Sequence, residues 1–478
     1  METKNAFPFI IASLLAPALS AQYEIGTGKV SELFNANCAS CHGENLMGGQ
    51  GSSLVDDVWA YGSSDADIAR VIANGIPDTA MIPWKTSLSE KQIRSLVIYI
   101  REQGQIAAQK ELPGDHFKPE NGVFKSQEHN FTLTKVGEGE GILWALEFLP
   151  DNTMLVTQRD GVLWSFKDGK RSKIEGIPEV WQHGQGGLLE VQKHPNFENN
   201  GWIYLGYSEN VGGKENGMDA GMTAVVRGRI RNGKWVDEQK IYNAPAELHI
   251  SAAYHYGTRF VFQDGYLYFA IGDRGRQNQA QDLSRPNGKI HRIFDDGRVP
   301  TDNPFASIRD ALPTIWSYGH RNPQGLDAHP ETGDIWEVEH GPRGGDETNL
   351  IQRGLNYGWP VITYGMNYNG TPITDLTEKE GMEQPKHYWN PSIAICGADF
   401  YEGDKFPAWK NNFFVTGMAS QEMHRLVIEE GKVVSDEVVF KNQGRVRDIY
   451  SAPDGHLYVL LIQQSPLVGS IYRLDPLN

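Results

Sequence analysis

The chain has 478 residues, of which 39% are hydrophobic and 22% are charged, a balance typical of soluble globular proteins with room for two or three domains. Its formal net charge of −16 argues against nucleic-acid binding, because proteins that bind nucleic acids carry basic patches that neutralise phosphates. With 52 glycines and an aromatic content of 10%, the composition favours a turn-rich β architecture.

Residues 1–21 are predicted to be a signal peptide. The apolar stretch "FPFIIASLLAPAL" follows Lys4, and the small residues of "ALSAQ" offer a cleavage site near Ser20 or Ala21. An uncleaved anchor is the alternative, but the stretch contains two prolines and is too short to cross a bilayer, and no later segment is suitable. We therefore expect a periplasmic or secreted protein without an integral membrane span.

Residues 22–105 are predicted to form an all-α domain. Helical periodicity begins in "KVSELFNANCASCH", continues in "SDADIARVIANGI" up to Gly75, and returns in "SEKQIRSLVIYIREQG". In this last segment Ser89 and Gln92 have the spacing of a capping box, and Gly104 predicts the helix end. Residues 106–130 are polar and aperiodic, which indicates a linker.

The first helix leads into "CASCH", a haem attachment motif. In C-x-x-C-H, two thiols add to the haem vinyl groups and the histidine ligates the iron, so Cys38, Cys41 and His42 predict a covalent haem c. A thioredoxin-like redox pair or a zinc half-site is the alternative, but the strand or second Cys/His pair that these need is missing. The remaining cysteine, Cys396, is expected to be a small buried side chain.

Met81 is the candidate for the sixth haem ligand. It precedes Pro83 in a loop between two predicted helices, an arrangement that resembles the methionine loop of class I cytochromes c. A methionine buried in the core is the alternative. The N-terminal segment is thus predicted to be a cytochrome c domain.

Residues 131–478 have the pattern of short strands and turns, and one sequence motif recurs six times. Each copy is an apolar strand, a turn rich in Pro, Asp, Asn and Gly, and a second strand with aromatic residues. The copies are "LWALEFLPDNTMLVTQRDGVLWSF", "GGLLEVQKHPNFENNGWIYLGYS", "GTRFVFQDGYLYFAIGDRG", "PQGLDAHPETGDIWEVEHG", "ADFYEGDKFPAWKNNFFVTG" and "RVRDIYSAPDGHLYVLLI". A sandwich would explain the strands but not the recurrence, which predicts an all-β six-bladed propeller.

Three segments of the propeller carry candidate binding chemistry. Arg321 and Asn322 lie in "GHRN", and Arg445 and Arg447 alternate in "GRVRD", so both should point to one strand face. Arginines that converge from separate blades would hold a planar polyanion, although surface salt bridges are the alternative. The tight turn in "EHGPRGGDE", followed by two carboxylates, suits Ca²⁺.

The chain from about 140 to 476 resembles the soluble PQQ-dependent aldose sugar dehydrogenases, also called the glucose/sorbosone dehydrogenase family. The motifs that carry the resemblance are "GQGGLLEVQKHPNF", "HYGTRFVF", "AIGDRG", "GHRNPQGL", "EHGPRGGDETNLI", "NYGWP" and "GRVRDIYSAPDG". The resemblance implies a six-bladed propeller with pyrroloquinoline quinone (PQQ) and Ca²⁺ in its central mouth.

The resemblance also implies roles for single residues around the quinone. His255 falls where the family keeps its general base, and Asp273 falls where a carboxylate orients that imidazole. Arg321 and Asn322 match the groups beside the reactive quinone oxygens. The two arginines of "GRVRD" match the clamp for the carboxylates of the cofactor.

Metal ligands are implied in the same way. Gly341 and Pro342 match the backbone carbonyls that hold the catalytic Ca²⁺, and Glu347 with the Tyr357 carbonyl matches a second, structural Ca²⁺.

Gln185 matches a polar group of the sugar pocket, and two positions depart from the family pattern. Ser420 stands where the family usually places a lysine against the cofactor, which puts the affinity for the quinone in question. Some glucose-oxidising members have an aspartate just before the base, where this chain has Tyr254, which leaves the choice of aldose open.

The sequence therefore predicts a quinohaemoprotein that oxidises aldose sugars to lactones by hydride transfer to PQQ. Its electrons would pass to the haem and then to an external acceptor, such as a soluble cytochrome, a copper protein or a quinone-linked chain. A PQQ-dependent dehydrogenase of a non-aldose alcohol and a non-catalytic propeller with a haem electron-transfer domain are the alternatives.

Overall fold

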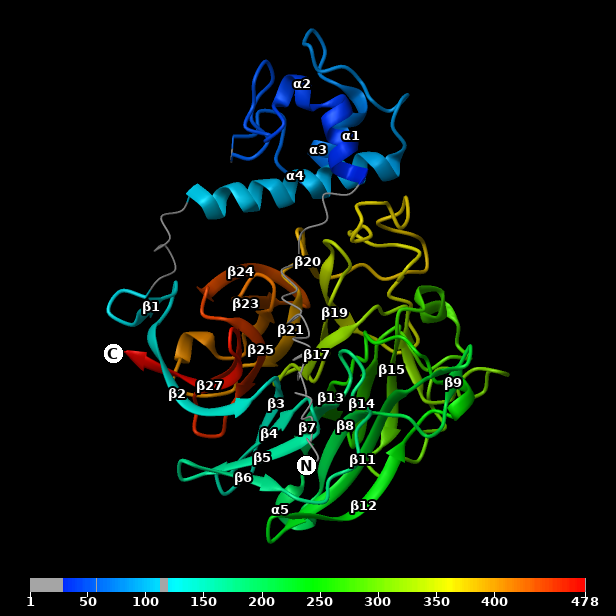
Figure 1. Cartoon of the computed structure of the whole chain (residues 1–478), viewed down its shortest axis with the longest axis vertical. Coiled ribbons are helices and arrows are strands. Elements are labelled where there is room, and N and C mark those ends of the chain that lie inside the picture. Colours follow the sequence, from blue (N-terminus) through cyan, green and yellow to red (C-terminus); the bar gives the residue numbers. More distant parts are fainter. Residues whose placement is uncertain (1–28, 57, 112–118, 478) are drawn as a thin grey trace, which may run out of the picture.

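The computed structural model describes residues 29–56, 58–111 and 119–477, so the predicted signal peptide lies outside the described residues. A small helical domain lies at one end of a large ring of β-sheets (Figure 1). In the part of the chain that is described, no helix combines the length and hydrophobicity needed to cross a membrane.

The helical domain contains α1 (Lys29–Asn37), α2 (Ala39–His42), α3 (Asp65–Asn74) and α4 (Glu90–Glu111). Gly75 ends α3 as predicted, with its N–H bonded to the Val71 carbonyl. The capping box that precedes α4 is also confirmed, because the Ser89 N–H donates to Gln92 Oε1 (2.9 Å) and the Gln92 N–H donates to Ser89 Oγ (3.3 Å).

The predicted end of α4 at Gly104 is wrong. The helix continues to Glu111 and takes in the first residues of the segment predicted to be a linker. The residues after Gly104 include two alanines, two glutamines and a lysine, all good helix formers, which offset the cost of about 1 kcal/mol for a glycine inside a helix.

Six sheets form the blades of the propeller. The first blade has β3 (Leu143–Phe148), β4 (Met154–Gln158), β5 (Val162–Lys167) and β6 (Lys170–Ile174). The second has β7 (Leu188–Lys193), β8 (Ile203–Glu209), β11 (Met222–Arg231) and β12 (Lys234–Tyr242), with α5 (Phe197–Asn200) and the hairpin of β9 (Lys214–Glu215) and β10 (Met218–Asp219) in its loops. The third has β13 (Phe260–Gln263), β14 (Tyr266–Ile271), β15 (Lys289–Phe294) and β16 (Ile315–Tyr318).

The remaining blades follow the same order. The fourth has β17 (Pro323–Ala328), β18 (Ile335–Glu339), β19 (Asp346–Ile351) and β20 (His387–Trp389). The fifth has β21 (Ile395–Phe400), β22 (Phe413–Gly417), β23 (Glu422–Glu429) and β24 (Lys432–Lys441). The sixth has β25 (Arg445–Ser451), β26 (Leu457–Gln464) and β27 (Leu467–Leu477), completed by β2 (Asn130–Glu140) and β1 (Val123–Lys125).

The ring is closed by strands from the two ends of the propeller. In the sixth blade, β2 pairs antiparallel with β27, from Asn130 opposite Leu477 to Glu140 opposite Val468. This pairing removes the open edges that a linear row of sheets would have. Each of the six sequence repeats contains the first two strands of one blade, so the predicted six-bladed propeller is confirmed.

Apolar side chains pack mainly between neighbouring blades. Trp336 of β18, for example, lies against Phe413 of β22, with ring centroids 6.3 Å apart, and both side chains are fully buried. Complete burial of an aromatic or branched side chain stabilises the fold by about 1.5–3 kcal/mol. Contacts of this kind position the strands and the loops that carry the candidate site residues.

The helical domain faces the propeller through α4. In Figure 1, α4 runs between the other three helices and the sheets, near β19 and β20. The Arg94 guanidinium of α4 donates to the Thr363 carbonyl, and Met366 of the propeller lies within the hydrophobic core of the helical domain. The two domains therefore share a packed interface.

Candidate active site

His255 and Asp273 lie together in two loops that flank β13 and β14. His255 adopts a left-handed backbone conformation (φ 59°), uncommon for a residue with a side chain, and its Nδ1 lies 2.7 Å from Asp273 Oδ1. The other carboxylate oxygen of Asp273 accepts a hydrogen bond from Trp359 Nε1 (2.8 Å), and Oδ1 also accepts one from the Gly275 N–H (2.7 Å). Asp273 is fully buried, so both of its oxygens are fixed in place.

Burial and a neighbouring cation keep the imidazole neutral. Burial and then the positive charge of Arg321 lower the pKa of His255 to about 4, while Asp273 opposes the shift. Although burial resists ionisation of Asp273, the hydrogen bond from His255 and the charge of Arg321 hold the pKa of this carboxyl below its usual range. Since Nδ1 is bonded to Asp273 and no described residue bonds Nε2, the free Nε2 lone pair can accept a proton.

Arg321 and Asn322 lie beside this pair, just before β17. One terminal nitrogen of Arg321 donates to the carbonyls of His340 (2.5 Å) and Gly341 (2.7 Å), and its guanidinium lies 5.4 Å from the centre of the Trp359 ring. Arg321 Nε is buried and has no partner among the described residues. The Asn322 amide oxygen accepts from the Gly257 N–H (3.3 Å), which connects Asn322 to the loop of His255.

Arg445 and Arg447 both belong to β25, but their alternation is interrupted. The pairing of β25 with β26 shifts register between Val446 and Asp448, which makes Arg447 the extra residue of a β-bulge. A shared direction of the two side chains therefore stays a prediction. Arg445 is partly exposed, whereas Arg447 is buried.

Arg447 is held by groups that the sequence did not point to. Its guanidinium lies 4.1 Å from the centre of the Trp144 ring and contacts Cys396 Sγ (2.8 Å) and Gln324 Oε1 (3.1 Å). Burial lowers the pKa of Arg447 to about 10, and its Nε has no partner among the described residues. Cys396 is buried as predicted, but beside this guanidinium rather than in a purely apolar setting.

Gly341 and Pro342 form the tight turn that the sequence indicated. The Gly341 carbonyl accepts from Arg321 and lies 2.9 Å from His340 Nδ1, while the Gly341 N–H donates to Asp346 Oδ1 (2.8 Å). A Cβ at position 341 would lie 2.2 Å from the Gly345 carbonyl oxygen, so only glycine fits there. Carbonyl oxygens are hard ligands of the kind that Ca²⁺ takes, although in this structure the Gly341 carbonyl is bonded to Arg321.

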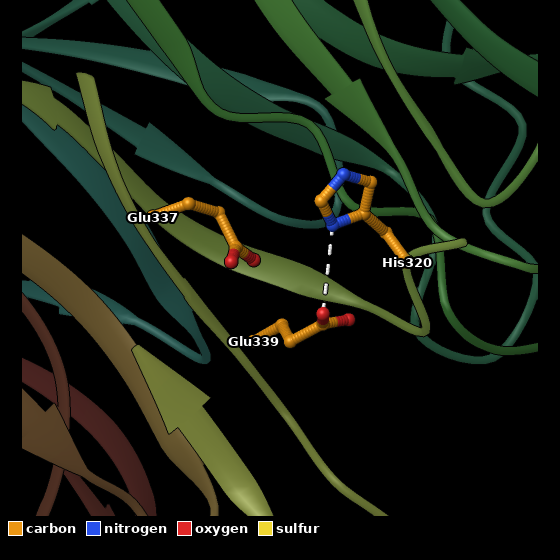
Figure 2. Close-up of side chains that lie close together, drawn as sticks. All are labelled: His320, Glu337 and Glu339. Carbon is orange, nitrogen blue, oxygen red and sulfur yellow. Dashed lines mark ion pairs between the residues drawn. The ribbon is translucent and has the colours of Figure 1, made fainter. Parts of the chain in front are cut away.

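Glu347, itself only partly buried, borders the buried pair of Glu337 and Glu339. It stands opposite Glu339 in the pairing of β18 with β19, and Glu337 lies two residues before Glu339. Burial and then the charge of Glu339 raise the pKa of both Glu337 and Glu347 well above the usual range. Figure 2 shows Glu337, Glu339 and His320, whose ligand atoms all lie within 4.8 Å of one another, with His320 Nδ1 3.5 Å from Glu339 Oε1.

The carboxylates of this cluster fit the predicted structural Ca²⁺ in the chemistry of their donors, whereas His320 offers a nitrogen and Glu347 is not among the three grouped residues. Buried like charges require protons or a cation, and carboxylate oxygens are the ligands that Ca²⁺ prefers. Tyr357 borders the cluster, with its ring stacked on that of His320 at 4.6 Å. Sequence analysis missed Glu337 and Glu339, although "EVE" in a strand places two carboxylates on one face.

Gln185 and Tyr254 lie beside His255, whereas Ser420 lies beside Ile393 in the fifth blade. Gln185 is exposed, and its side-chain oxygen accepts from the His255 N–H (2.9 Å), so it supports the backbone of the candidate base. Tyr254 is 43% exposed and meets the His255 ring edge-on at 4.9 Å. Ser420 donates to the Ile393 carbonyl (3.3 Å), so its hydroxyl does not replace the charge of a lysine.

The haem motif lies at the start of α2. Cys38 immediately precedes α2, Cys41 and His42 belong to α2, and neither cysteine forms a disulfide. His42 Nδ1 lies 2.8 Å from the Ser52 carbonyl, which leaves Nε2 for an iron. Met81 packs half-buried against the core of the helical domain, so it fits both of the roles considered for it.

The comparisons with known proteins agree with this geometry. Residues 141–469 match the family described as Glucose / Sorbosone dehydrogenase. The chain belongs to this family. Residues 27–100 of this sugar dehydrogenase match the family described as Cytochrome C oxidase, cbb3-type, subunit III, which confirms the cytochrome c domain.

Individual relatives cover nearly the whole propeller of this sugar dehydrogenase. It is 42% identical over 344 residues to the aldose sugar dehydrogenase YliI of Escherichia coli, a match that covers 70% of this chain and 90% of the relative. It is 28% identical over 421 residues to quinoprotein glucose dehydrogenase B of Acinetobacter calcoaceticus, covering 70% and 86%. The crystal structure of the E. coli soluble aldose sugar dehydrogenase in its apo form matches with a TM-score of 0.67 and 37% identity, covering 73% of this chain and 100% of that one.

Proposed function

We propose that the protein is a quinohaemoprotein that oxidises aldose sugars to lactones, with PQQ and Ca²⁺ in the propeller and a covalent haem c in the cytochrome domain. The observation that carries the proposal is a neutral, oriented His255 beside a buried, incompletely bonded Arg321. The relatives named as an aldose sugar dehydrogenase and a quinoprotein glucose dehydrogenase support the substrate class and the quinone.

The residues present fit an anionic, planar cofactor. Arg321 and Arg447 are buried guanidiniums, each with an Nε that lacks a partner among the described residues, and a carboxylate or quinone oxygen would satisfy such groups. The Gly341 and Pro342 carbonyls would hold the catalytic Ca²⁺, and Glu347 with the Tyr357 carbonyl the structural one. Since Ser420 brings no positive charge, Arg445 and Arg447 would carry more of the binding of the cofactor carboxylates.

In this proposal His255 is the general base. When bound, PQQ supplies a hydride acceptor polarised by Ca²⁺, and haem c supplies a one-electron carrier. His255 Nε2 takes the proton of the anomeric hydroxyl, while the hydrogen on the anomeric carbon leaves as hydride and the carbon–oxygen bond becomes the lactone carbonyl. Asp273 holds the imidazole in the required tautomer and stabilises the imidazolium that forms.

The cytochrome domain is the outlet for the electrons in this scheme. A two-electron oxidation must be emptied one electron at a time, and tethering the carrier raises its effective concentration at the propeller. The helix α2, which contains Cys41 and His42 of the haem motif, lies beyond α4 as seen from the sheets (Figure 1). A soluble cytochrome, a copper protein or a quinone-linked chain in the periplasm could act as the external acceptor, consistent with the predicted signal peptide.

The direct test is a substrate panel with the apo-protein reconstituted with PQQ and Ca²⁺. Aldoses should reduce both an artificial dye and the haem, whereas simple alcohols should reduce neither. If simple alcohols reduce the haem and aldoses do not, the substrate is a non-aldose alcohol and not a sugar. Failure of every substrate after saturation with PQQ and Ca²⁺ would establish a non-catalytic propeller.

A further inference from the structure

The interface between the two domains is tight in one place and open in another. An open groove of about 520 Å³ runs along part of the interface, with Asp65 and Arg101 on one side and Tyr364 and His387 on the other. Close contacts join Arg94 of α4 to the Thr363 carbonyl, Lys91 of α4 to Asp375, and Glu102 of α4 to the turn that contains Arg343. Among these contacts, the pair of Glu102 with Arg343 lies directly beside the turn that contains Gly341 and Pro342.

Glu102 and Arg343 form a bidentate ion pair across the interface. Arg343 Nε lies 2.7 Å from Glu102 Oε1 and 2.9 Å from Oε2, and a terminal nitrogen of Arg343 also bonds Oε2. Each side chain is only 6% exposed. Removal of one partner from such a pair leaves an uncompensated buried charge, so each domain depends on the other for this contact.

Arg343 directly follows Gly341 and Pro342, the proposed Ca²⁺ ligands. Its N–H donates to the Met366 carbonyl (3.0 Å), its carbonyl accepts from the Met366 N–H (2.9 Å), and Met366 is buried in the core of the cytochrome domain. A Cβ on Gly344 would lie 3.3 Å from Ile98 Cγ2 of α4. The turn is thus held from the propeller side by Arg321 and from the other side by the cytochrome domain.

We propose that the docked cytochrome domain positions the cofactor site, because Glu102 holds Arg343 and thereby fixes the carbonyls of Gly341 and Pro342. This inference rests on the proposed function, since it assigns Ca²⁺ and PQQ to that turn. Glu102 is a positioning residue and touches neither cofactor. Because coupling is reciprocal, loading of the site also strengthens docking of the cytochrome domain.

The test measures binding without sugar and without turnover. Full-length apo-protein is titrated with Ca²⁺ in the presence of PQQ by calorimetry, for the wild type, Glu102→Gln and Glu90→Gln, the last a control at an exposed position of the same helix. Glu102→Gln should weaken binding roughly tenfold, within the 5–150-fold range of coupled sites, and Glu90→Gln should bind as the wild type does. The charge swap Glu102→Arg with Arg343→Glu should recover most of the loss.

The outcomes separate this inference from the proposed function. Equal binding by the wild type and Glu102→Gln overturns the inference alone, whereas a wild type that binds neither Ca²⁺ nor PQQ overturns both. A protein that shows the predicted difference but oxidises no aldose leaves the inference standing and removes the proposed reaction.

A measurement on the wild type covers the case in which Glu102→Gln does not fold. Loading with Ca²⁺ and PQQ should slow amide hydrogen exchange of α4 around Glu102, and unchanged exchange overturns the inference.

Discussion

His255 Nδ1 lies 2.7 Å from Asp273 Oδ1, and Asp273 cannot turn away, because its second oxygen is bonded to Trp359 and its first also accepts from the Gly275 N–H. The geometry fixes both the tautomer and the orientation of an imidazole whose Nε2 is free. Such an arrangement serves proton transfer better than it serves packing, and each member of it can be altered separately.

Replacing Asp273 by Asn should lower kcat by about 10²–10⁴-fold, the range in which a well-placed base contributes. The amide keeps the shape of the side chain, but it carries no charge and can present an N–H to His255 Nδ1. The neutral imidazole therefore loses its fixed tautomer. Asp264→Asn, in the exposed turn between β13 and β14, is the matched control and should leave kcat unchanged. Near-normal turnover of Asp273→Asn would remove Asp273 from the mechanism.

Replacing Trp359 by Phe should lower kcat about 10–100-fold, because it removes a hydrogen bond to a charged group worth about 1.5–3 kcal/mol while it keeps a ring near Arg321. Trp316→Phe is the control, since the Trp316 indole N–H has no partner among the described residues. KM should change little in both variants. An equal loss of kcat in both would point to general destabilisation instead.

The pH profile of kcat/KM should stay flat well below pH 6.5. Burial and the charge of Arg321 lower the pKa of His255 to about 4, so the base is neutral above that pH and is lost as an imidazolium only below it. Arg321→Gln removes the positive charge and should move the acid limb toward pH 6.5, apart from its effect on rate. The account of the site would be contradicted if the acid limb of the wild-type kcat/KM profile lay near pH 6.5. It would also be contradicted if the acid limb of Arg321→Gln lay at the same pH as that of the wild type.

Met81→Leu should change the haem spectrum and lower the haem potential by on the order of 0.1 V, part of the range of about 0.8 V that axial ligands set. Reduction of an artificial dye at the propeller should be unaffected. Met47→Leu is the control, because Met47 is exposed on the same domain. A Met81→Leu protein with a normal haem potential would leave Met81 as a core residue only.

Stability should fall between about pH 6.5 and pH 9 because of His424. This buried imidazole lies 2.6 Å from Asp436 and 3.3 Å from Glu422, and although burial opposes the shift, these carboxylates raise its pKa to about 9. Because the pKa of His424 in the folded state lies above the unfolded value of about 6.5, the protonated imidazole stabilises the fold. This stabilisation is complete below pH 6.5 and is lost as the pH rises through 9.

At about 1.36 kcal/mol per pKa unit, the loss is about 3 kcal/mol. His387 and the pair of Lys441 with Glu422 face the same network, so the comparison must be made against one variant in which only the imidazole is changed. Chemical denaturation of the wild type and His424→Gln at pH 6, 7.5 and 9 checks this. The variant should show no loss in that window, and a parallel decline in both proteins would rule out His424 as its source.

The sequence predicted the parts of the molecule that local pattern determines. Six hairpins recur with alternating strands and turn residues, and all six are the first two strands of a blade. The haem motif is contiguous, and the candidate base and its carboxylate were found because both lie in motifs shared with a known family. The continuation of α4 past Gly104 was missed because a single glycine is a weak signal against good helix formers on both sides.

Contacts between distant residues could not be predicted in this way. Trp359 bonds Asp273 from another blade, and Cys396 of β21 contacts Arg447 of β25. Glu102 pairs with Arg343 from another domain. No periodicity marks such pairs, because they depend on how whole blades and domains pack. Glu337 and Glu339 could have been singled out from the sequence, because burial of two acidic side chains on one face of a strand costs free energy and therefore indicates a function.

The most direct test of the proposed function is anaerobic mixing of the reconstituted, oxidised full-length protein with an aldose while the haem absorbance is recorded. The account predicts rapid haem reduction in the wild type and its loss in His255→Gln, with PQQ still bound and the haem still reducible by dithionite. Haem reduction by the aldose at an undiminished rate in His255→Gln, or in the wild type without PQQ and Ca²⁺, would contradict it.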